Sequence, residues 1–493
     1  MLVMNRITAI MPYRTGRGFR RMVEPLIESS SVGRIIVIHG DERPPSLPKC
    51  EARRAPSFYD GRTWNELIEE IRTGFFLLIR DGDEVEAGSR ALERLLETAQ
   101  IRGAGMVYTD YWEEGAGGCR LHPVNDHQPG SLRDTFDFGP AQLFSTRTVR
   151  KAIRRHGAVA DCRHAGLYDL RLKLSLEGPL FHLPETLFTV RRAGISPPAL
   201  DLFSYVDPDN QAAQQEMEAA VTAHLKRIDA WIGPPFEPPP TIRKRFPVEA
   251  SVVIPVRNRA TTIAEAVRSA LDQKTDFPFN VIVVDNHSTD GTAKALSKLS
   301  RTGKVIHHVP ARTDLGIGGC WNEAIALPSC GRWTVQLDSD DLYSGPDSLQ
   351  QLVSFLRQGR FAMVVGAYTL VDECFEMIPP GLVAHREWTD DNGPNNALRV
   401  NGFGAPRAFD TALIRKIGFL NVSYGEDYAL ALRISRRYRI GRIYESLYLC
   451  RRWSGNTDAD LSIYEANRND AFKDTIRTLE ILARQKRNRE AQP

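Results

Sequence analysis

The chain has 493 residues, of which 64 are Lys or Arg and 61 are Asp or Glu, so its formal net charge is +3. At ~100 to 200 residues per domain, this length predicts two or three compact units. The contents of 42% hydrophobic and 25% charged residues are typical of globular proteins. This composition excludes a disordered chain, a collagen-like chain and a basic coat for nucleic acid, so we expect no nucleic-acid partner.

The seven cysteines are scattered and form no Cys-x-x-Cys pair, which argues against a disulfide framework or a structural zinc site. The N-terminus passes directly into a strand-like run without the pattern of a leader peptide. No apolar run approaches the ~18 residues that a membrane span needs. These features predict a cytoplasmic protein.

Two similar strand patterns open two similar segments of the chain. Residues 8–14 and 251–257 each form an apolar run that ends in Pro and Arg. A helical pattern and a second buried-type strand follow each of them, the strands falling at 34–38 and 281–284. This parallel indicates an internal repeat.

The spacing of later motifs supports the repeat. Trp64-Asn65-Glu66 recurs as Trp321-Asn322-Glu323, and an Asp-x-Asp pair follows each Trp after the same 17 positions, at Asp81 and at Asp338. We therefore predict a tandem duplication. The predicted parts are a first domain at 1–192, a helical and Pro-rich linker at 193–248, a second domain at 249–460 and a C-terminal helical tail at 461–493.

Strands alternate with helices in both copies, which predicts two α/β units with mainly parallel, Rossmann-like sheets. Ligands of such sheets bind at the carboxyl ends of the strands. Three candidate segments follow predicted strands, namely residues 255–258, 285–288 and 338–341. We expect the functional site at that edge of the second sheet.

Asp338 and Asp340 are two carboxylates at positions i and i+2 after a strand, so they point to the same side. Mg²⁺ and Mn²⁺ prefer hard oxygen ligands and often bind to one or two carboxylates together with substrate phosphates. The pair could therefore share one divalent cation. The alternative is an ordinary Asp-rich surface turn.

Three further features each have a functional and a structural interpretation. Asp285 ends an apolar run and could accept a hydrogen bond from a nucleobase or a ribose, or it could belong to a turn with residues 288–290 capping the next helix. Asp427, in the first turn of a helix, could be a general base or could favour the helix dipole. Arg451 and Arg452 could close over a diphosphate or form a solvated basic turn.

Together these motifs resemble a family-2 glycosyltransferase of the GT-A fold over residues 249 to about 457. The resemblance is carried by Val-Val-Ile-Pro-Val-Arg-Asn at 252–258, Val-Asp-Asn-His-Ser-Thr-Asp-Gly-Thr at 284–292, Trp-Asn-Glu-Ala at 321–324, Leu-Asp-Ser-Asp-Asp at 337–341 and Gly-Glu-Asp-Tyr at 425–428.

The resemblance implies a role for each matching residue. The residues expected to bind the nucleotide sugar are Pro255, Arg257, Asp285, Asn322, Asp338 and Arg452. Asp338 and Asp340 are expected to hold Mn²⁺ or Mg²⁺ on the donor diphosphate, and Asp427 is expected to be the catalytic base of an inverting displacement.

Two departures from the family pattern stand out. No His occurs at 452–456 to supply a further metal ligand, and Trp321 replaces the usual Arg, which leaves Arg312 as a candidate for that contact. Acceptor selection is expected in the segments 387–391 and 401–407.

The first copy, residues 6–192, resembles the same family more weakly. Asp81 and Asp83 match the metal pair, and Asp169 is matched to Asp427. His39 stands where the second copy has Asp285. The first copy is therefore predicted to be a partly divergent GT-A domain that holds a second site at Asp81, Asp83 and Asp169.

The tail at 463–489 has apolar residues at near-helical spacing and a basic end. One interpretation is a helix that packs on the second domain. The other is peripheral contact with an anionic membrane at its inner face, where a lipid-linked acceptor would lie.

The predicted function is transfer of a sugar from a nucleotide-diphosphate sugar, with a UDP-sugar as the first candidate, to a hydroxyl of a glycan, lipid-linked or protein acceptor. The setting would be assembly of a surface glycan or glycoconjugate. Two alternatives stay open: a bifunctional polymerase whose two sites add different sugars, and a non-catalytic scaffold that binds sugar nucleotides.

Overall fold

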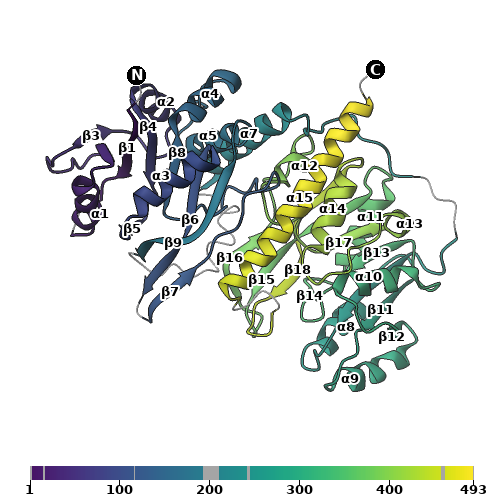
Figure 1. The fold of residues 1–493 in the computed structure, drawn as a ribbon. Coiled ribbons are helices and arrows are strands. Elements are labelled where there is room, and N and C mark those ends of the chain that lie inside the picture. The colour runs from purple at the N-terminus through teal and green to yellow at the C-terminus, as the bar shows by residue number, and fades with distance from the viewer. Residues whose placement is uncertain are drawn as a thin grey trace. The chain divides into compact units, whose positions relative to one another are not determined.

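The computed structural model describes residues 3–14, 17–115, 117–192, 210–240, 245–456 and 461–491. These residues form two compact units (Figure 1). The first unit contains the described residues up to 192, residues 210–231 and residues 461–491, and the second contains the described residues between 232 and 456.

The first unit is built on a sheet with strand order β3-β2-β1-β4-β8-β6-β9-β5, and β7 pairs with β6. Strands β1 to β4 are parallel, whereas β8 is antiparallel to β4 and β6. Its elements are β1 (Val3–Pro12), α1 (Arg17–Glu28), β2 (Val32–His39), β3 (Cys50–Arg54), α2 (Gly61–Glu70), β4 (Thr73–Ile79), β5 (Asp83–Ala87), α3 (Ala91–Arg102), β6 (Met106–Gly115), β7 (Gly118–His122), β8 (Ala141–Ser145), α4 (Thr146–His156), α5 (Gly166–Leu174), β9 (Leu180–Arg192), α7 (Gln211–Arg227) and α15 (Ile463–Ala491).

The second unit is built on a sheet with strand order β12-β11-β10-β13-β17-β15-β18-β14, and β16 pairs with β15. Its elements are β10 (Ala250–Val256), α8 (Ile263–Leu271), β11 (Phe279–Asp285), α9 (Thr292–Leu299), the short 3₁₀ helix η3 (Ser300–Thr302), β12 (Val305–His308), α10 (Ile317–Ala326), β13 (Trp333–Gln336), β14 (Leu342–Tyr343), α11 (Ser348–Arg357), β15 (Met363–Val371), β16 (Met377–Val383), α12 (Gly393–Asn396), β17 (Arg407–Asp410), α13 (Thr411–Ile417), α14 (Glu426–Ser435) and β18 (Ile440–Arg451).

The two sheets have the same strand order when their strands are numbered along the chain, and each has nine strands within the described residues. The agreement includes the hairpin partner outside the main path, β7 in one unit and β16 in the other. One difference is that α9 and η3 lie between β11 and β12, whereas residues 40–49, between β2 and β3, contain no helix. The mixed α/β architecture and the shared strand order are consistent with the predicted pair of tandem α/β domains.

Apolar strands with helices on both faces account for the core of each unit. Every residue of β11 is buried, as expected for a parallel strand covered on both faces. In the first unit, α2, α4 and α5 contact one another, while α3 contacts β6, β8 and β9. In the second unit, α10 contacts α13 and α14, while α11 contacts β13, β15, β17 and β18.

The predicted linker divides between the two units. Helix α7 contacts α5 and belongs to the first unit. In the second unit, Glu237 forms a β-bridge with Tyr438, and its backbone N–H donates to the carbonyl of Arg437 at 2.9 Å. The Pro-rich segment, as far as it is described, thus lies along the second unit. Residues 193–209 and 241–244 of the predicted linker lie outside the described residues.

The C-terminal helix α15 is grouped with the first unit, which corrects the expectation that it packs on the second. The guanidinium of Arg133 is 2.8 Å from Asp470 and 3.2 Å from Asp474, and the backbone N–H of Gly130 donates to Thr478 at 2.8 Å. These contacts join residues more than 300 positions apart, so the helical periodicity of the tail could not reveal them. Among the described residues, none of the helices combines the length and the apolar character that crossing a membrane requires.

Candidate functional site

The predicted donor-binding residues lie at the carboxyl ends of three neighbouring strands of the second unit. Pro255 is in β10, Asp285 is the last residue of β11, and Asp338 comes two residues after β13. Strand β10 pairs in parallel with both β11 and β13, and Val256 is in register with Asp285. These residues therefore meet at one edge of the sheet, where α/β proteins bind ligands.

Asp285 is buried, and both oxygens of its carboxylate have partners. The backbone N–H of Ser288 donates to Oδ1 at 2.9 Å, and Nε2 of His307 is 3.1 Å from Oδ2. His307 lies in β12 and was not predicted as a site residue. Only the pairing of β12 with β11 brings it beside Asp285, and that pairing has no signal in the sequence.

The loop after β11 is fixed by hydrogen bonds to the loop after β10. The backbone N–H of Thr289 donates to Oδ1 of Asn258 at 2.8 Å, and the N–H of Asn258 donates to Oγ of Ser288 at 2.9 Å. Asp290 accepts from the N–H of Thr292, the first residue of α9, at 2.8 Å, and its hydrogen bonds with Thr292 hold its pKa below the usual range. The N-cap of α9 is Gly291, rather than one of the residues 288–290 that were predicted to cap this helix.

Arg257 follows β10 directly and is exposed. Within the described part of the chain it forms no ion pair, so its guanidinium is available to an anionic ligand at this edge. The predicted nucleotide contact of Arg257 stays a prediction.

The acidic segment after β13 is folded into the protein rather than forming a solvated turn. Nε2 of Gln336 donates to both oxygens of Asp338, at 3.1 and 3.0 Å. Asp341 is buried and accepts from the backbone N–H of Arg451 at 2.8 Å. Asp340 keeps 13% of its side chain exposed and is held by the loop that follows β18.

Two carboxyl groups of this segment, those of Asp338 and Asp341, have a raised pKa. Burial raises the pKa of Asp338, and the charge of Asp340 adds to the effect, whereas Gln336 and the guanidinium of Arg407 oppose it. Burial, together with the charges of Asp338 and Asp340, raises the pKa of Asp341 well above its usual range. Concentrated negative charge of this kind favours binding of a cation.

A divalent cation fits this donor set in part. Two carboxylates are a common protein contribution to a Mg²⁺ or Mn²⁺ site, and substrate phosphates and water supply the remaining ligands. In the described ranges, no group of three or more His, Cys, Asp or Glu side chains is arranged to hold a metal ion. A cation here would therefore depend on oxygen atoms from a bound diphosphate.

Asp427, in the first turn of α14, forms an ion pair with Arg407 of β17. Nη2 of Arg407 is 2.6 Å from Oδ2 of Asp427, and Nε of Arg407 donates to the carbonyl of Gly404 at 2.6 Å. The sequence placed Arg407 only in a segment for acceptor selection. Because its charge also opposes the rise in the pKa of Asp338, Arg407 links the acidic segment to Asp427.

Glu426 is a second carboxyl group at the start of α14, and only 8% of its surface is exposed. Burial raises its pKa to about 8, and the charge of Asp427 adds to the shift. The charges of Arg407 and Asp338 also act on it, in opposite directions. Glu426 thus belongs to one set of interacting charges together with Asp338, Arg407 and Asp427. The sequence did not indicate that Glu426 takes part.

The two arginines predicted to close over a diphosphate have different surroundings. Arg451 is buried, its Nη2 is 2.7 Å from Glu265, and its guanidinium lies 4.3 Å from the ring centre of Phe375. It is therefore a structural residue here rather than part of a solvated turn. Arg452 is half-buried, and its backbone N–H donates to Val371 at 2.8 Å. The predicted diphosphate contact of Arg452 stays a prediction.

Asn322 has a structural task. Its Nδ2 donates to the carbonyl of Phe419 at 2.9 Å, and its Oδ1 accepts from the N–H of the same residue at 3.0 Å. Asn65 of the first unit makes the same two bonds to the backbone of Val159, both at 2.9 Å. The shared pattern explains the repeated Trp-Asn-Glu motif through folding, and the predicted sugar contact of Asn322 stays a prediction.

Arg312, the candidate for the contact usually made by the family's Arg, pairs with Asp314 at 2.7 Å, and both side chains are exposed. Nothing in this geometry directs Arg312 towards the acidic segment.

In the first unit, the residues that match the metal pair are only partly comparable with Asp338 and Asp340. Asp81 is 3.1 Å from Nη2 of Arg14, and both side chains are partly exposed. Asp83 begins β5, and its side chain lies outside the described residues. The register of β1 with β2 places His39 at the position of Asp285, in agreement with the sequence.

The match between Asp169 and Asp427 is wrong by two positions. The hydroxyl of Tyr168 donates to Leu132 and that of Tyr428 to Ala397, both at 2.5 Å. The first helical bonds run from Asp169 to Ala165 and from Ala429 to Gly425. Asp169 therefore corresponds to Ala429, and Leu167 occupies the position of Asp427.

Asp169 has a structural environment of its own. It is 1% exposed, lies 2.5 Å from Nζ of Lys173 and accepts from the backbone N–H of Ala160 at 2.9 Å. A carboxylate that is buried and neutralised in this way cannot serve an acceptor as a base. The sequence match paired Asp169 with Asp427, whereas the equivalent residues of the two helices are the neighbouring Tyr168 and Tyr428.

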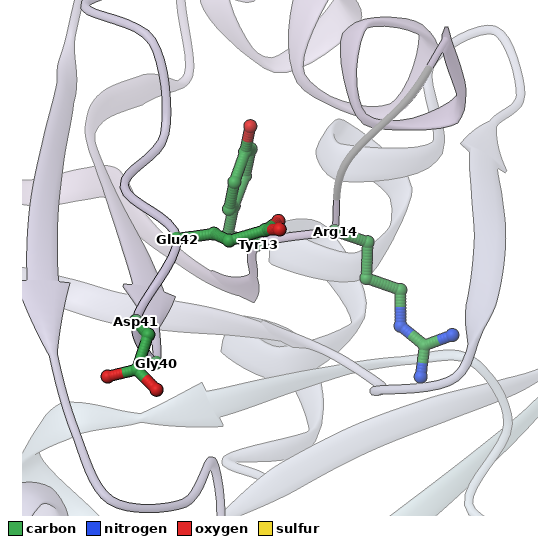
Figure 2. A pocket seen from close by; sticks show the side chains of 5 residues that line it. All are labelled: Tyr13, Arg14, Gly40, Asp41 and Glu42. Atoms are coloured by element: carbon green, nitrogen blue, oxygen red, sulfur yellow. The ribbon is translucent and has the colours of Figure 1, made fainter.

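The first unit has a pocket at the carboxyl ends of β1 and β2, with a volume of about 470 Å³. It is lined by Tyr13, Arg14, Gly40, Asp41 and Glu42 (Figure 2). This position corresponds to the predicted nucleotide pocket of the second unit. However, Arg14 pairs with Asp81, and Asp41, with 94% of its side chain exposed, pairs with Arg54. The pocket therefore lacks a buried carboxylate like Asp285.

The second unit is similar in sequence to known glycosyltransferases. Residues 251–416 match the model of glycosyl transferase family 2. A Bacillus subtilis protein named as a teichuronic acid biosynthesis glycosyltransferase, TuaG, is 28% identical over 148 residues, which is 30% of this chain and 58% of that protein. Chondroitin synthase of Pasteurella multocida is 29% identical over 168 residues, which is 32% of this chain and 16% of that protein. The chain thus spans less than two thirds of the length of either relative.

Among solved structures, S. aureus TarS 1-349 in complex with UDP-GlcNAc is 22% identical, with a TM-score of 0.37 over 48% of this chain and 72% of that chain.

Proposed function

The second unit is a family-2 glycosyltransferase domain, and on this basis we propose that the chain is an inverting, metal-dependent glycosyltransferase with its active site in that unit. It would transfer a sugar from a nucleotide-diphosphate sugar, with a UDP-sugar as the first candidate, to the hydroxyl of a glycan, lipid-linked or protein acceptor. The names of the relatives, a teichuronic acid biosynthesis glycosyltransferase and a chondroitin synthase, support a role in polysaccharide or glycoconjugate assembly.

One observation carries the proposal. Arg407 is 2.6 Å from Asp427 and also acts on the charge of Asp338, so the proposed base and the proposed metal ligand belong to one group of charges. A transfer reaction needs this combination, because the leaving diphosphate and the incoming hydroxyl react at the same sugar carbon.

The residues of the chain have separate tasks in the proposed reaction. A Mn²⁺ or Mg²⁺ ion held by Asp338 and Asp340 would supply positive charge to the departing diphosphate. Asp427 accepts the proton of the attacking hydroxyl, and Arg407 holds its carboxylate in place. Asp285, with Pro255 and Arg257, meets the nucleotide at the neighbouring strand ends.

The first unit is proposed to lack transferase activity. Leu167 cannot accept a proton at the position of Asp427, and Lys173 neutralises Asp169. His39 replaces the nucleotide-binding carboxylate. These substitutions favour a single active site over the two-site polymerase. Conversely, the retention of Asp338, Asp340 and Asp427 in the second unit favours a working enzyme over a binding scaffold.

The variant Asp427→Asn tests the proposed base, since it keeps the shape of the side chain but removes the proton acceptor. We expect kcat for transfer to fall by ~10²- to 10⁴-fold with little change in the KM for the donor. Release of the nucleoside diphosphate measures both constants across a panel of nucleotide sugars. The matched control Asp272→Asn changes an exposed Asp of the same unit and should leave turnover unchanged. Unchanged turnover in Asp427→Asn would exclude Asp427 as the base.

A further inference from the structure

The loop of residues 453–456, which follows β18, contacts the acidic segment through one carboxylate oxygen. The indole N–H of Trp453 donates to Oδ2 of Asp340 at 3.0 Å, and Nδ2 of Asn456 lies 3.3 Å from the same oxygen. Nε of Arg259 is 3.9 Å from it. The sequence predicted this loop only as a cover for a diphosphate.

The conformation of the loop is defined by contacts that fix the indole of Trp453. A Cβ atom on Gly455 would lie 2.5 Å from the ring of Trp453, so only glycine lets the ring fold back over the loop. Oδ1 of Asn456 accepts from the backbone N–H of Trp453 at 2.7 Å, and its Nδ2 also donates to the carbonyl of Arg451 at 3.0 Å.

Arg259 attaches the other side of the loop to the second unit. Its Nη2 donates to the carbonyl of Gly455 at 2.9 Å, and its guanidinium lies 5.8 Å from the ring centre of Trp453. Its backbone N–H donates to Oγ1 of Thr292, at the start of α9. The indole is therefore held from both sides, and its N–H is aimed at Asp340 by several independent contacts.

These contacts make the two oxygens of Asp340 unequal. Oδ2 is occupied by N–H donors, whereas Oδ1 has no hydrogen bond to any described residue. The side chain is 13% exposed, so a small ion can still reach it. A carboxylate in this state can offer one oxygen to a cation while the other anchors its orientation, which is how hydrogen-bonding partners outside the ligand shell tune metal sites.

We propose that Trp453 and Asn456 are positioning residues that make Asp340 bind the divalent cation of the donor complex through Oδ1 alone. This inference rests on the proposed function, because it presumes that Asp340 is a metal ligand. It assigns the loop a task that a His ligand would otherwise perform, since the loop strengthens the site without contributing a ligand of its own.

The opposite relation would be competition, in which the N–H donors occupy the place of the cation. The two relations predict opposite signs. Under the proposal, loss of the indole N–H weakens binding of Mn²⁺, because Asp340 is free to rotate. Under competition, the same loss strengthens it.

The test is a titration of the full chain with Mn²⁺, followed by the electron paramagnetic resonance signal of the free ion, with saturating UDP and without nucleotide. Trp453→Phe keeps an aromatic ring but removes the N–H, and we expect it to raise the Kd for Mn²⁺ by ~10-fold or more. Gly455→Ala keeps the indole but displaces it, and we expect a change in the same direction. Trp112→Phe, at a half-exposed Trp of the first unit, is the matched control and should bind Mn²⁺ like the original chain.

Asp340→Ala separates the two levels of the argument. If Asp340→Ala weakens Mn²⁺ binding while Trp453→Phe and Gly455→Ala leave it unchanged or tighten it, the positioning role is overturned and the metal site stands. If Asp340→Ala itself leaves Mn²⁺ binding unchanged, the metal assignment of the proposed function fails as well. Thermal unfolding without Mn²⁺ checks that every variant is folded.

Discussion

Arg407 holds one oxygen of Asp427 at 2.6 Å, and its own Nε is fixed to the carbonyl of Gly404. An ion pair of this kind holds a carboxylate in a fixed orientation. The position of the Asp427 carboxylate therefore depends on a residue of another element, strand β17.

The variant Arg407→Lys retains the positive charge but lacks the planar guanidinium, which contacts Asp427 through Nη2 and the carbonyl of Gly404 through Nε. We expect kcat to fall by ~10- to 100-fold with an unchanged KM for the donor, because the base is misplaced while donor binding is not. Steady-state kinetics with a purified acceptor measure this split. An equal rise in the KM for the donor would instead assign Arg407 to donor binding.

Glu426 predicts how stability depends on pH. Its folded-state pKa of about 8 lies above its ordinary value of 4.5, so the folded protein retains a proton that the unfolded chain releases between these two values. Stability attributable to this group is fully present below pH 4.5 and falls as the pH rises towards 8. Glu426→Gln should remove this part of the pH dependence. Denaturant midpoints between pH 5 and 8 that decline equally in both proteins would contradict the raised pKa.

At this scale the sequence revealed the carboxylates but not their partners. Asp338, Asp340 and Asp427 could be proposed as site residues from their residue type and spacing, and their roles stay predictions. Arg407 could not be predicted, because the place of β17 in the sheet is set by pairing with β13 and β15, which lie far from it along the chain. His307 could not be predicted, because the sequence does not show the register in which β12 pairs with β11. Glu426 was missed because its pKa arises from burial, which the sequence does not show.

At the scale of elements, the repeated Asn of the Trp-Asn-Glu motif joins a helix to the segment that follows α4 in the first unit and α13 in the second. Asn65 in α2 bonds to the backbone of Val159, and Asn322 in α10 bonds to that of Phe419. Since the same two bonds occur in both units, they serve the fold rather than a ligand.

We expect Asn65→Ala and Asn322→Ala to lower the free energy of unfolding by ~1 to 3 kcal/mol each, because each change leaves backbone groups without their partner. Denaturant unfolding of the two variants measures this. If Asn322→Ala instead preserved stability and raised the KM for the donor, the predicted sugar contact of Asn322 would be supported in place of the structural one.

The repeat shows where pattern matching succeeds and where it fails. The equal spacing from Trp64 to Asp81 and from Trp321 to Asp338 reflects two sheets with the same strand order. An Asp occurs near the start of both α5 and α14, but the residues that occupy equivalent positions there are Tyr168 and Tyr428. The buried hydroxyl contact of the Tyr is the same in both helices, whereas the position of the Asp differs by two residues between them.

At the scale of the whole molecule, the chain returns at its end to the first unit. Helix α15 places Asp474, which is fully buried, against Arg133, Ser131 and Arg477. The C-terminal helix therefore belongs to the first unit, although the second unit precedes it in the sequence. Helical periodicity identifies the apolar face of a C-terminal helix, but it does not show which unit that helix packs against.

Asp474→Ala leaves the buried guanidinium of Arg133 with fewer partners, so we expect the first unit to lose ~3 to 5 kcal/mol of stability. Hydrogen exchange of residues 123–133 should accelerate, and exchange in β10 and β11 should stay unchanged. Faster exchange confined to the second unit would contradict the grouping of α15 with the first.

The central claim is that one of the two similar units carries the chemistry. Matched double variants test it most directly: Asp338→Asn with Asp340→Asn in the second unit, and Asp81→Asn with Asp83→Asn in the first. Turnover of nucleotide sugars and the size and composition of the product should be measured for both. The account predicts that turnover is lost in the second-unit variant and that the first-unit variant keeps the original turnover and product. Loss of turnover, or a product lacking one of two sugars, in the first-unit variant would contradict it.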